Sequence, residues 1–246
     1  MTKNKAIVLE NVTKSVEIGE SGKTMEILHD ISLEAEKGEF LSIIGASGSG
    51  KTSLLHCMSG LSIPTKGQVT ILDVHPYELR ASKIAAFRRT KIGFIFQAYN
   101  LLPALPAFEN IVLPLRLAGK KIDKQEILSL LDQLKFHADI TSFVDALSGG
   151  EQQKIAIARV LVANCEVVFA DEPTGALDSV SGKIVFDLLR YLANQGVCVI
   201  MVTHDIELAA NTDRAIIMKD GQLVHSISKP FATQLFEAMS EETRPA

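Results

Sequence analysis

A glycine-rich stretch near the start of the chain has the residue types needed to bind phosphate. Residues 45–52 read Gly-Ala-Ser-Gly-Ser-Gly-Lys-Thr, between the apolar run 40–44 and a segment with helically spaced apolar residues. Glycines let the backbone curl so that successive N–H groups point inward at phosphate oxygens. The helix that follows adds the positive end of its dipole. This pattern predicts a phosphate-binding loop rather than an ordinary glycine-rich turn.

The predicted loop also supplies side chains. Lys51 can reach the β- and γ-phosphates of a nucleoside triphosphate, and the Thr52 hydroxyl can ligate Mg²⁺. The residues expected to contact the nucleotide here are Gly45, Ser47, Gly48, Ser49, Gly50, Lys51, Thr52 and Ser53.

Two adjacent carboxylates follow a second apolar run. Asp171 and Glu172 come directly after Val167–Ala170, and the carboxyl end of a buried strand is where α/β sheets bind ligands. Asp171 suits a water-mediated contact to Mg²⁺, and Glu172 suits the polarisation of an attacking water. Alternation along the strand is expected to separate the two side chains. An exposed acid pair at a strand end is the alternative, which the upstream phosphate loop disfavours.

A third motif, Leu147–Gln152, reads Leu-Ser-Gly-Gly-Glu-Gln. Ser148 and Glu151 form a capping-box pattern, which predicts the start of a helix. Gly149 and Gly150 each lower helix propensity by roughly 1 kcal/mol relative to alanine. A well-capped helix alone does not explain these two glycines, whereas a phosphate that closely approaches their amides does.

The surrounding elements alternate between strands and helices. Strands are expected at 6–10, 25–34, 40–44, 67–72, 91–96, 167–170 and 197–202, and helices at 80–90, 179–195 and 231–239. A hairpin is expected where Asp220-Gly221 joins 215–218 to 222–226, with a frayed tail over 241–246. From about 98 to 163 the pattern is helical, with one helix start at Asp123. Continuous apolar strands predict a parallel sheet, and the alternation predicts an α/β domain with right-handed crossovers.

Composition limits the function classes. The net charge of −4 is atypical of a general nucleic-acid binder. No apolar run approaches the ~20 residues of a membrane span, and the N-terminus has no secretory h-region. The three cysteines are expected to be buried thiols, and the six histidines show no metal-ligand spacing. A soluble cytoplasmic domain is therefore expected.

Together these motifs resemble those of ATP-binding cassette (ABC) transporter ATPases, over nearly the whole chain. The matching residues, in the family's order, are the phosphate loop Gly45–Thr52, the glutamine-loop residue Gln97, the signature Leu147–Gln152, the second nucleotide motif Val167–Glu172, the D-loop Ala176–Asp178 and the switch histidine His204. The resemblance implies one domain over residues 1–246. It implies a P-loop NTPase (RecA-like) core with a mainly parallel sheet, an N-terminal antiparallel β subdomain and an inserted helical subdomain at about 98–163.

The resemblance also implies a mechanism with ATP and Mg²⁺. Two copies would pair head to tail, so that the signature of one covers the γ-phosphate held by the other. The signature residues expected at that composite site are Ser148, Gly149, Gly150 and Glu151, with Asp178 from the D-loop. Gln97 would contact Mg²⁺ or the attacking water, His204 would stabilise the γ-phosphate, and Glu172 would be the general base. Thr52, Gln97 and Asp171 form the expected metal set.

The expected partner is a transmembrane permease docked beside residues 98–117, which would hold the chain at the cytoplasmic face of the cell membrane. Leu101, Leu102, Leu105, Phe108 and Leu113 are candidates for that contact surface or, equally, for internal core. Cargo is not visible in the sequence, because the membrane subunits of this family select it.

Finer motifs indicate a branch of the family. Phe96-Gln97, the run Asn100–Pro103, Glu109-Asn110 and the run Ala170–Asp178 resemble macrolide- and peptide-exporter and lipoprotein-releasing ATPases. The residues of the phosphate loop resemble those of members serving antimicrobial-peptide resistance permeases. Export of antimicrobial peptides, macrolides or lipoproteins is therefore expected.

One position departs from the family pattern. Family members usually stack adenine on an aromatic residue near Val16, but this chain has no Phe, Tyr or Trp before Phe40. Base stacking on an aromatic side chain is worth about 1–3 kcal/mol. We therefore predict weakened nucleotide affinity and poor discrimination between ATP and GTP, unless another residue supplies the contact.

Three alternatives lie in non-transport classes. A chromosome-associated or DNA-repair ATPase would need a long coiled-coil insertion between Gln97 and Leu147, where no sustained heptads occur. A translation-associated factor of this superfamily would carry two cassettes. A non-catalytic regulatory subunit is disfavoured because both Glu172 and His204 are present.

Overall fold

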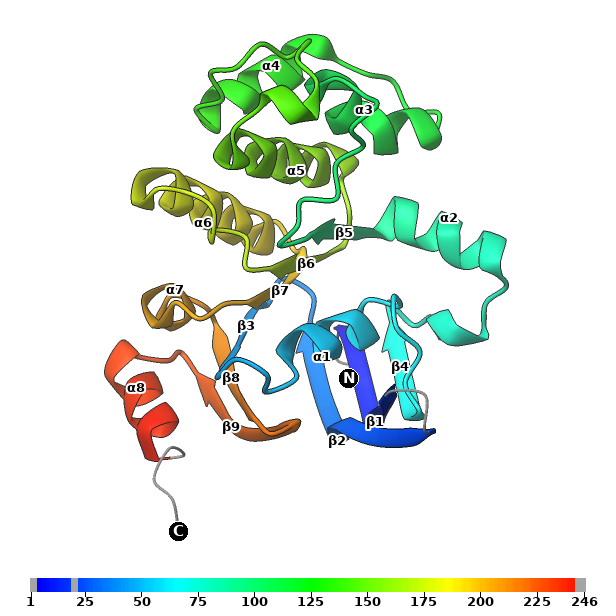
Figure 1. The fold of residues 1–246 in the computed structure, drawn as a ribbon, viewed down its shortest axis with the longest axis vertical. Coiled ribbons are helices and arrows are strands. Elements are labelled where there is room, and N and C mark those ends of the chain that lie inside the picture. The colour runs from blue at the N-terminus through cyan, green and yellow to red at the C-terminus, as the bar shows by residue number, and fades with distance from the viewer. Residues whose placement is uncertain (1–3, 19–21, 242–246) are drawn as a thin grey trace.

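Two sheets organise the molecule. The computed structural model describes residues 4–18 and 22–241. A three-stranded sheet has the strand order β2-β1-β4, and a six-stranded sheet has the order β5-β6-β7-β3-β8-β9. Figure 1 shows helices on both faces of the larger sheet, with α1 (Lys51–Met58) between the two sheets. The predicted α/β architecture is present.

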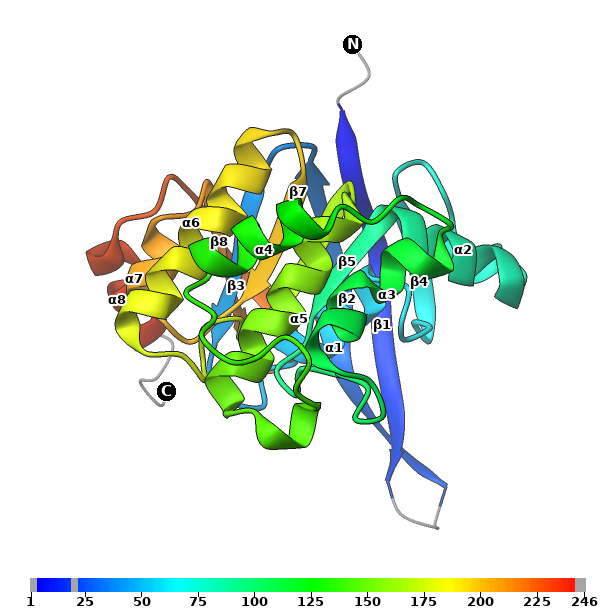
Figure 2. The same ribbon diagram turned by 90° about the horizontal axis from the view of Figure 1, so that it is seen from above.

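The smaller sheet is antiparallel throughout. It contains β1 (Lys5–Ile18), β2 (Lys23–Glu36) and β4 (Lys66–Ile71). The predictions 6–10 and 25–34 were too short, because β1 and β2 continue as a two-stranded ladder in which Val16 pairs with Met25. Figure 2 shows this hairpin extending beyond the rest of the molecule. Its outer part is largely exposed, so the local sequence pattern lacks the apolar alternation that identifies a half-buried strand.

The larger sheet carries the parallel core. Its parallel strands are β5 (Ile92–Ile95), β6 (Val167–Asp171), β7 (Cys198–Val202), β3 (Phe40–Gly45) and β8 (Arg214–Lys219). Every residue of β3, β6 and β7 is buried, which is why these strands read as continuous apolar runs. The predicted hairpin is confirmed, because β9 (Gln222–Ser228) pairs antiparallel with β8 across Asp220-Gly221. Both turn residues have positive φ, as a tight hairpin turn requires.

The segment predicted as helical contains three α-helices separated by irregular chain. They are α3 (Ala107–Leu117), α4 (Lys124–Gln133) and α5 (Gly149–Ala163). Asp123 caps α4 as predicted, since its carboxylate accepts hydrogen bonds from the amides of Gln125 and Glu126. Of the five candidate contact residues, Leu101 and Phe108 pack against the core, whereas Leu102 is 46% exposed.

The remaining helices are α2 (Ala81–Lys91), α6 (Ser179–Asn194), α7 (Ile206–Ala210) and α8 (Ala232–Glu241), with short 3₁₀ turns at Pro76–Glu78 and Val144–Ala146. The strand predicted from Lys91 begins one residue later, because Lys91 ends α2. Residues 242–246 of the predicted frayed tail lie outside the described residues. The three cysteines are free and buried, as expected.

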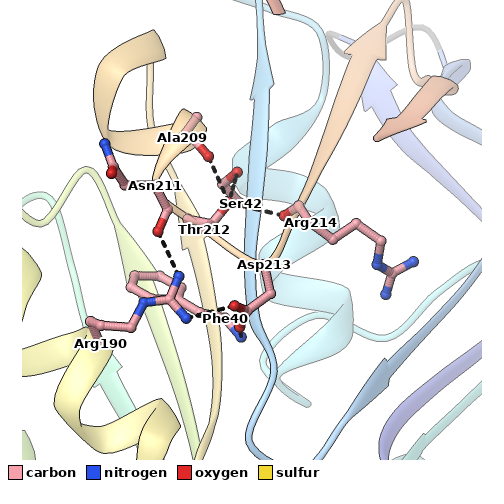
Figure 3. A network of polar contacts seen from close by, with 8 residues as sticks. All are labelled: Phe40, Ser42, Arg190, Ala209, Asn211, Thr212, Asp213 and Arg214. Atoms are coloured by element: carbon pink, nitrogen blue, oxygen red, sulfur yellow. Dashed lines mark hydrogen bonds and ion pairs between the residues drawn. The ribbon is translucent and has the colours of Figure 1, made fainter. Parts of the chain in front are cut away.

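A polar clamp ties α6 to the amino ends of β3 and β8 (Figure 3). Arg190 donates to Asp213 at 2.7 Å and to the Asn211 carbonyl at 2.6 Å, and it lies 4.9 Å above the Phe40 ring. Asp213 in turn accepts a hydrogen bond from the Phe40 amide at 2.8 Å. Ser42 and Thr212 add a buried hydroxyl pair at 2.9 Å. The clamp fixes the end of the sheet opposite the phosphate loop.

Candidate functional site

Four neighbouring strands end at one edge of the large sheet, and each end carries a predicted site residue. In the order β5-β6-β7-β3 these are Gln97, then Asp171 with Glu172, then His204, then the phosphate loop. Carboxyl ends of parallel strands meet at one edge, where α/β sheets bind ligands. The strand order therefore brings together residues that lie far apart in the chain.

These residues line one cleft of about 450 Å³. Its walls contain Ile27, Gly45, Ser47, Gly48, Gly50, Lys51, Thr52, Ser53, Gln97, Asp171, Glu172, Val202 and His204. Ile27, from β2, was not identified from the sequence. It belongs to a strand whose pairing brings it over the loop, and no local motif marks it.

The phosphate loop connects β3 to α1 and contains glycines at positions where the structure disfavours any other residue. A Cβ at Gly45 would lie 2.2 Å from the carbonyl oxygen of Met218, so the close packing against β8 excludes a side chain. Gly48 and Gly50 have φ of +82° and +97°, which favours glycine. The loop is therefore a compact turn, with glycines in the left-handed region, directly before a helix N-terminus.

Lys51 and Thr52 begin α1 and point their polar groups at the loop and the sheet edge. The Lys51 ammonium donates to the carbonyls of Gly45 at 2.9 Å and Ala46 at 2.7 Å. Burial lowers the pKa of Lys51, and the charges of Glu172 and Asp171 oppose that shift. A cation is thus held at the mouth of the loop, where the phosphates of a nucleotide would lie.

Thr52 and Asp171 provide oxygens suited to a magnesium ion. The Thr52 hydroxyl donates to the Asp171 carboxylate at 3.4 Å. Burial raises the pKa of Asp171, while the Thr52 hydrogen bond and His56 pull it down. In the part of the chain that the structure describes, no three His, Cys, Asp or Glu side chains cluster closely enough to hold a metal. The oxygens of Thr52 and Asp171 would therefore complete a Mg²⁺ site only together with phosphate and water oxygens. Mg²⁺ is usually bound by one or two protein carboxylates with such additional ligands.

Glu172 and His204 form a pair at the edge of the cleft. The distance between His204 Nδ1 and Glu172 Oε1 is 2.9 Å, with the Glu172 side chain 15% exposed and His204 76% exposed. Glu172 has φ of +49° and lies just beyond β6. A left-handed turn, rather than the expected strand alternation, therefore separates its side chain from that of Asp171.

The signature residues do not line this cleft in the described chain. Ser148 caps α5 by accepting a 3.3 Å hydrogen bond from the Glu151 amide. The capping box is only half formed, because Glu151 Oε1 lies 3.8 Å from Lys154 and its Oε2 is buried without a hydrogen-bond partner. Gly149 and Gly150 occupy the first turn of α5. A single copy thus holds two separate helix N-termini that carry glycines.

Asp178 and Val16 also lie outside the cleft lining. Asp178 caps α6 by accepting from the amides of Val180 and Ser181 at 3.0 Å, and these hydrogen bonds lower its pKa. Val16 is 37% exposed on β1, opposite Met25. Met25 lies two residues before Ile27, so the two share a face of β2.

A glycine loop after β3, an acid pair at the carboxyl end of β6 and a mainly parallel sheet define a P-loop nucleotide-binding protein. The sequence profile of the ABC transporter family matches residues 28–175, and the chain belongs to that family. The resemblance predicted from the motifs is therefore confirmed, and the chain contains an ABC transporter ATP-binding domain.

Relatives agree with this assignment. The macrolide export ATP-binding/permease protein MacB of Campylobacter jejuni is 43% identical over 242 residues, which cover 97% of this chain. This chain spans only 37% of the length of that MacB relative. The lipoprotein-releasing system ATP-binding protein LolD of Shewanella denitrificans is 43% identical over 204 residues, covering 82% of this chain and 88% of LolD.

A solved structure has the same fold. The dimeric ATP-binding cassette MJ0796, in a post-hydrolysis state with ADP and Pi, superposes with a TM-score of 0.85 and 37% identity. The match covers 92% of this chain and 99% of MJ0796. The predicted fold class, with an antiparallel N-terminal sheet and a mainly parallel sheet, is therefore confirmed.

Proposed function

We propose that this chain binds Mg²⁺–ATP, hydrolyses it and thereby powers a membrane exporter of antimicrobial peptides, macrolides or lipoproteins. The observation that carries the proposal is the convergence of the phosphate loop, Asp171 and the Glu172–His204 pair on one cleft. The names of the MacB and LolD relatives support the exporter branch.

In the proposed mechanism the loop amides and Lys51 neutralise the phosphate charge. Thr52 and Asp171 would hold Mg²⁺, which supplies Lewis-acid polarisation of the phosphate oxygens. Glu172 accepts the proton of the attacking water, and His204 orients Glu172 and contacts the γ-phosphate. Gln97, which follows β5 and lines the cleft, would contact the metal or the water. Such positioning and charge neutralisation are what in-line phosphoryl transfer needs most.

We further propose that two copies pair head to tail on ATP. The signature residues Ser148, Gly149, Gly150 and Glu151 do not line the cleft of their own chain, although their helix N-terminus suits an anion. A second copy would bring them, with Asp178, over the γ-phosphate. The dimeric form of the similar cassette MJ0796 supports this arrangement.

The proposed partner is a transmembrane permease, which would place the chain at the cytoplasmic face of the membrane. Within residues 4–18 and 22–241 no helix combines the length and apolarity needed to span a bilayer. A largely apolar groove of about 350 Å³ adjoins segment 98–117, with Leu113, Pro114 and Leu117 in its wall. We propose that the permease docks on the side of the molecule that carries this groove. We also propose that residues 98–163 act as a helical subdomain of a single domain 1–246.

The test is Mg²⁺-dependent ATP hydrolysis by the purified chain, followed by membrane-fraction co-purification with a permease. We expect hydrolysis that depends on Glu172, and enrichment in membranes rather than on ribosomes or DNA. Absence of any ATP cleavage, including with a permease present, would overturn the proposal. Association with DNA or ribosomes alone would favour the non-transport alternatives.

A further inference from the structure

The backbone directly after Gln97 is strained. Tyr99 and Asn100 have φ of +60° and +48°, so two consecutive residues other than glycine occupy the left-handed region. Each such residue brings Cβ close to the following carbonyl and costs energy. Such a conformation persists only when the surrounding structure imposes it. The cause of this turn therefore lies in its tertiary contacts.

One side chain of α5 makes those contacts. The Arg159 guanidinium donates to the Asn100 carbonyl at 2.8 Å and to the Tyr99 carbonyl at 2.9 Å. A rigid planar fork with several N–H donors can bind two successive carbonyls, which a single ammonium cannot do with the same geometry. Burial lowers the pKa of Arg159, but an arginine this basic stays charged.

The same loop touches α5 at its first turn. A Cβ at Gly149 would lie 3.1 Å from the Tyr99 hydroxyl oxygen, so Tyr99 lies against the signature residue. The turn is thus held by α5 at two points. Gln97 itself, two residues before Tyr99, lines the cleft. The geometry of Gln97 depends on the direction in which this turn leaves β5.

We propose that Arg159 is a positioning residue that holds the turn at 99–100 and thereby aims Gln97 into the cleft. This inference rests on the proposed function, in which Gln97 contacts the metal or the water. Misplacement of a reacting group by about 1 Å can cost 10²-fold in rate. Loss of Arg159 therefore lowers kcat much more than it raises KM for ATP.

The test is a double-mutant cycle on kcat at saturating Mg²⁺–ATP, with Arg159→Met and Gln97→Ala. We expect Arg159→Met alone to lower kcat roughly 10-fold to 100-fold. In the Gln97→Ala background the same change should cost less than about 2-fold, because there is no longer a glutamine to aim. Arg190→Met is the matched control, since Arg190 also binds a carbonyl but belongs to the remote clamp (Figure 3).

The fold-change in kcat caused by the control Arg190→Met should multiply with the fold-change caused by Gln97→Ala, whatever the size of the Arg190→Met effect alone. Equal losses from Arg159→Met in both backgrounds would overturn the inference and leave Arg159 as a structural residue. If Arg159→Met does not fold, Arg159→Lys takes its place in the cycle, with a smaller expected loss. A wild-type chain without ATP hydrolysis would overturn the proposed function together with this inference. If the wild type is active and the effects of Arg159→Met and Gln97→Ala on kcat simply multiply, the inference is overturned while the proposed function stands.

Discussion

Nδ1 of His204 lies 2.9 Å from the Glu172 carboxylate, although the two residues come from the ends of different strands. Glu172 is mostly covered and His204 is largely exposed. The imidazole can therefore hold the carboxylate on one side and face a phosphate on the other. In the proposed mechanism, Glu172 is the base and His204 is the group that orients it.

The first prediction concerns this base. Glu172→Gln keeps the size of the side chain but removes the proton acceptor, so we expect kcat for ATP hydrolysis to fall 10²-fold to 10⁴-fold. ATP binding should remain, and the variant should accumulate as a closed dimer on ATP. Kinetics, nucleotide titration and size-exclusion chromatography measure these effects. Glu237→Gln on α8 is the control, and normal turnover by Glu172→Gln would remove Glu172 from the mechanism.

The second prediction separates stability from function at Asp171. Burial raises the pKa of Asp171 in the folded chain above its unfolded value. The folded state therefore binds the proton more tightly, and the free energy of unfolding falls as pH rises through the folded pKa. The ionised Asp171 carboxylate, which we propose as a metal ligand, is thus destabilising at neutral pH.

We expect Asp171→Asn to raise Tm at neutral pH while abolishing Mg²⁺-dependent hydrolysis. The gain in Tm should shrink in acid, where Asp171 is protonated in both states. Thermal unfolding across a pH series checks this, with the exposed Asp132→Asn as the control. A lower Tm for Asp171→Asn at neutral pH would contradict the expectation.

The third prediction concerns the close approach at the loop. Gly45→Ala places a methyl group against the Met218 carbonyl, and overpacking of this kind costs about 1–3 kcal/mol. We expect the loop to shift, with loss of nucleotide binding and a lower Tm. Gly48→Ala is the comparison, because its Cβ would meet open space and only the positive φ is strained. Equal effects of the two substitutions would show that the contact with β8 is unimportant.

The fourth prediction concerns the base of the nucleotide. Val16→Tyr supplies an aromatic platform worth about 1–3 kcal/mol, so ATP affinity should rise about 10-fold, with better discrimination against GTP. Titration of the wild type and of Val16→Tyr with ATP and with GTP measures these affinities. Glu17→Tyr is the control, since neighbouring residues of a strand point to opposite faces. No gain in Val16→Tyr would mean that the position, or the effect, is wrong.

Local chemistry determined the parts that the sequence predicted. The Asp123 and Ser148 caps and the Asp220-Gly221 hairpin each depend on residues within a few positions of one another. The motif of the phosphate loop is equally local, although the packing of Gly45 against Met218 is not. Short-range sterics and hydrogen bonds impose these structures in any context that lets the chain fold. The α/β class followed from the apolar periodicity for the same reason.

Only the tertiary structure decided which of these pieces meet. The order β5-β6-β7-β3 places Gln97, Asp171 and His204 beside the loop, and strand order depends on packing across the whole chain. The length of the β1–β2 ladder, the half-formed capping box at Glu151 and the two hydrogen bonds from Arg159 to the strained turn are likewise non-local. Contacts between distant residues leave no fixed spacing in a single sequence, so they become visible only once the chain has folded.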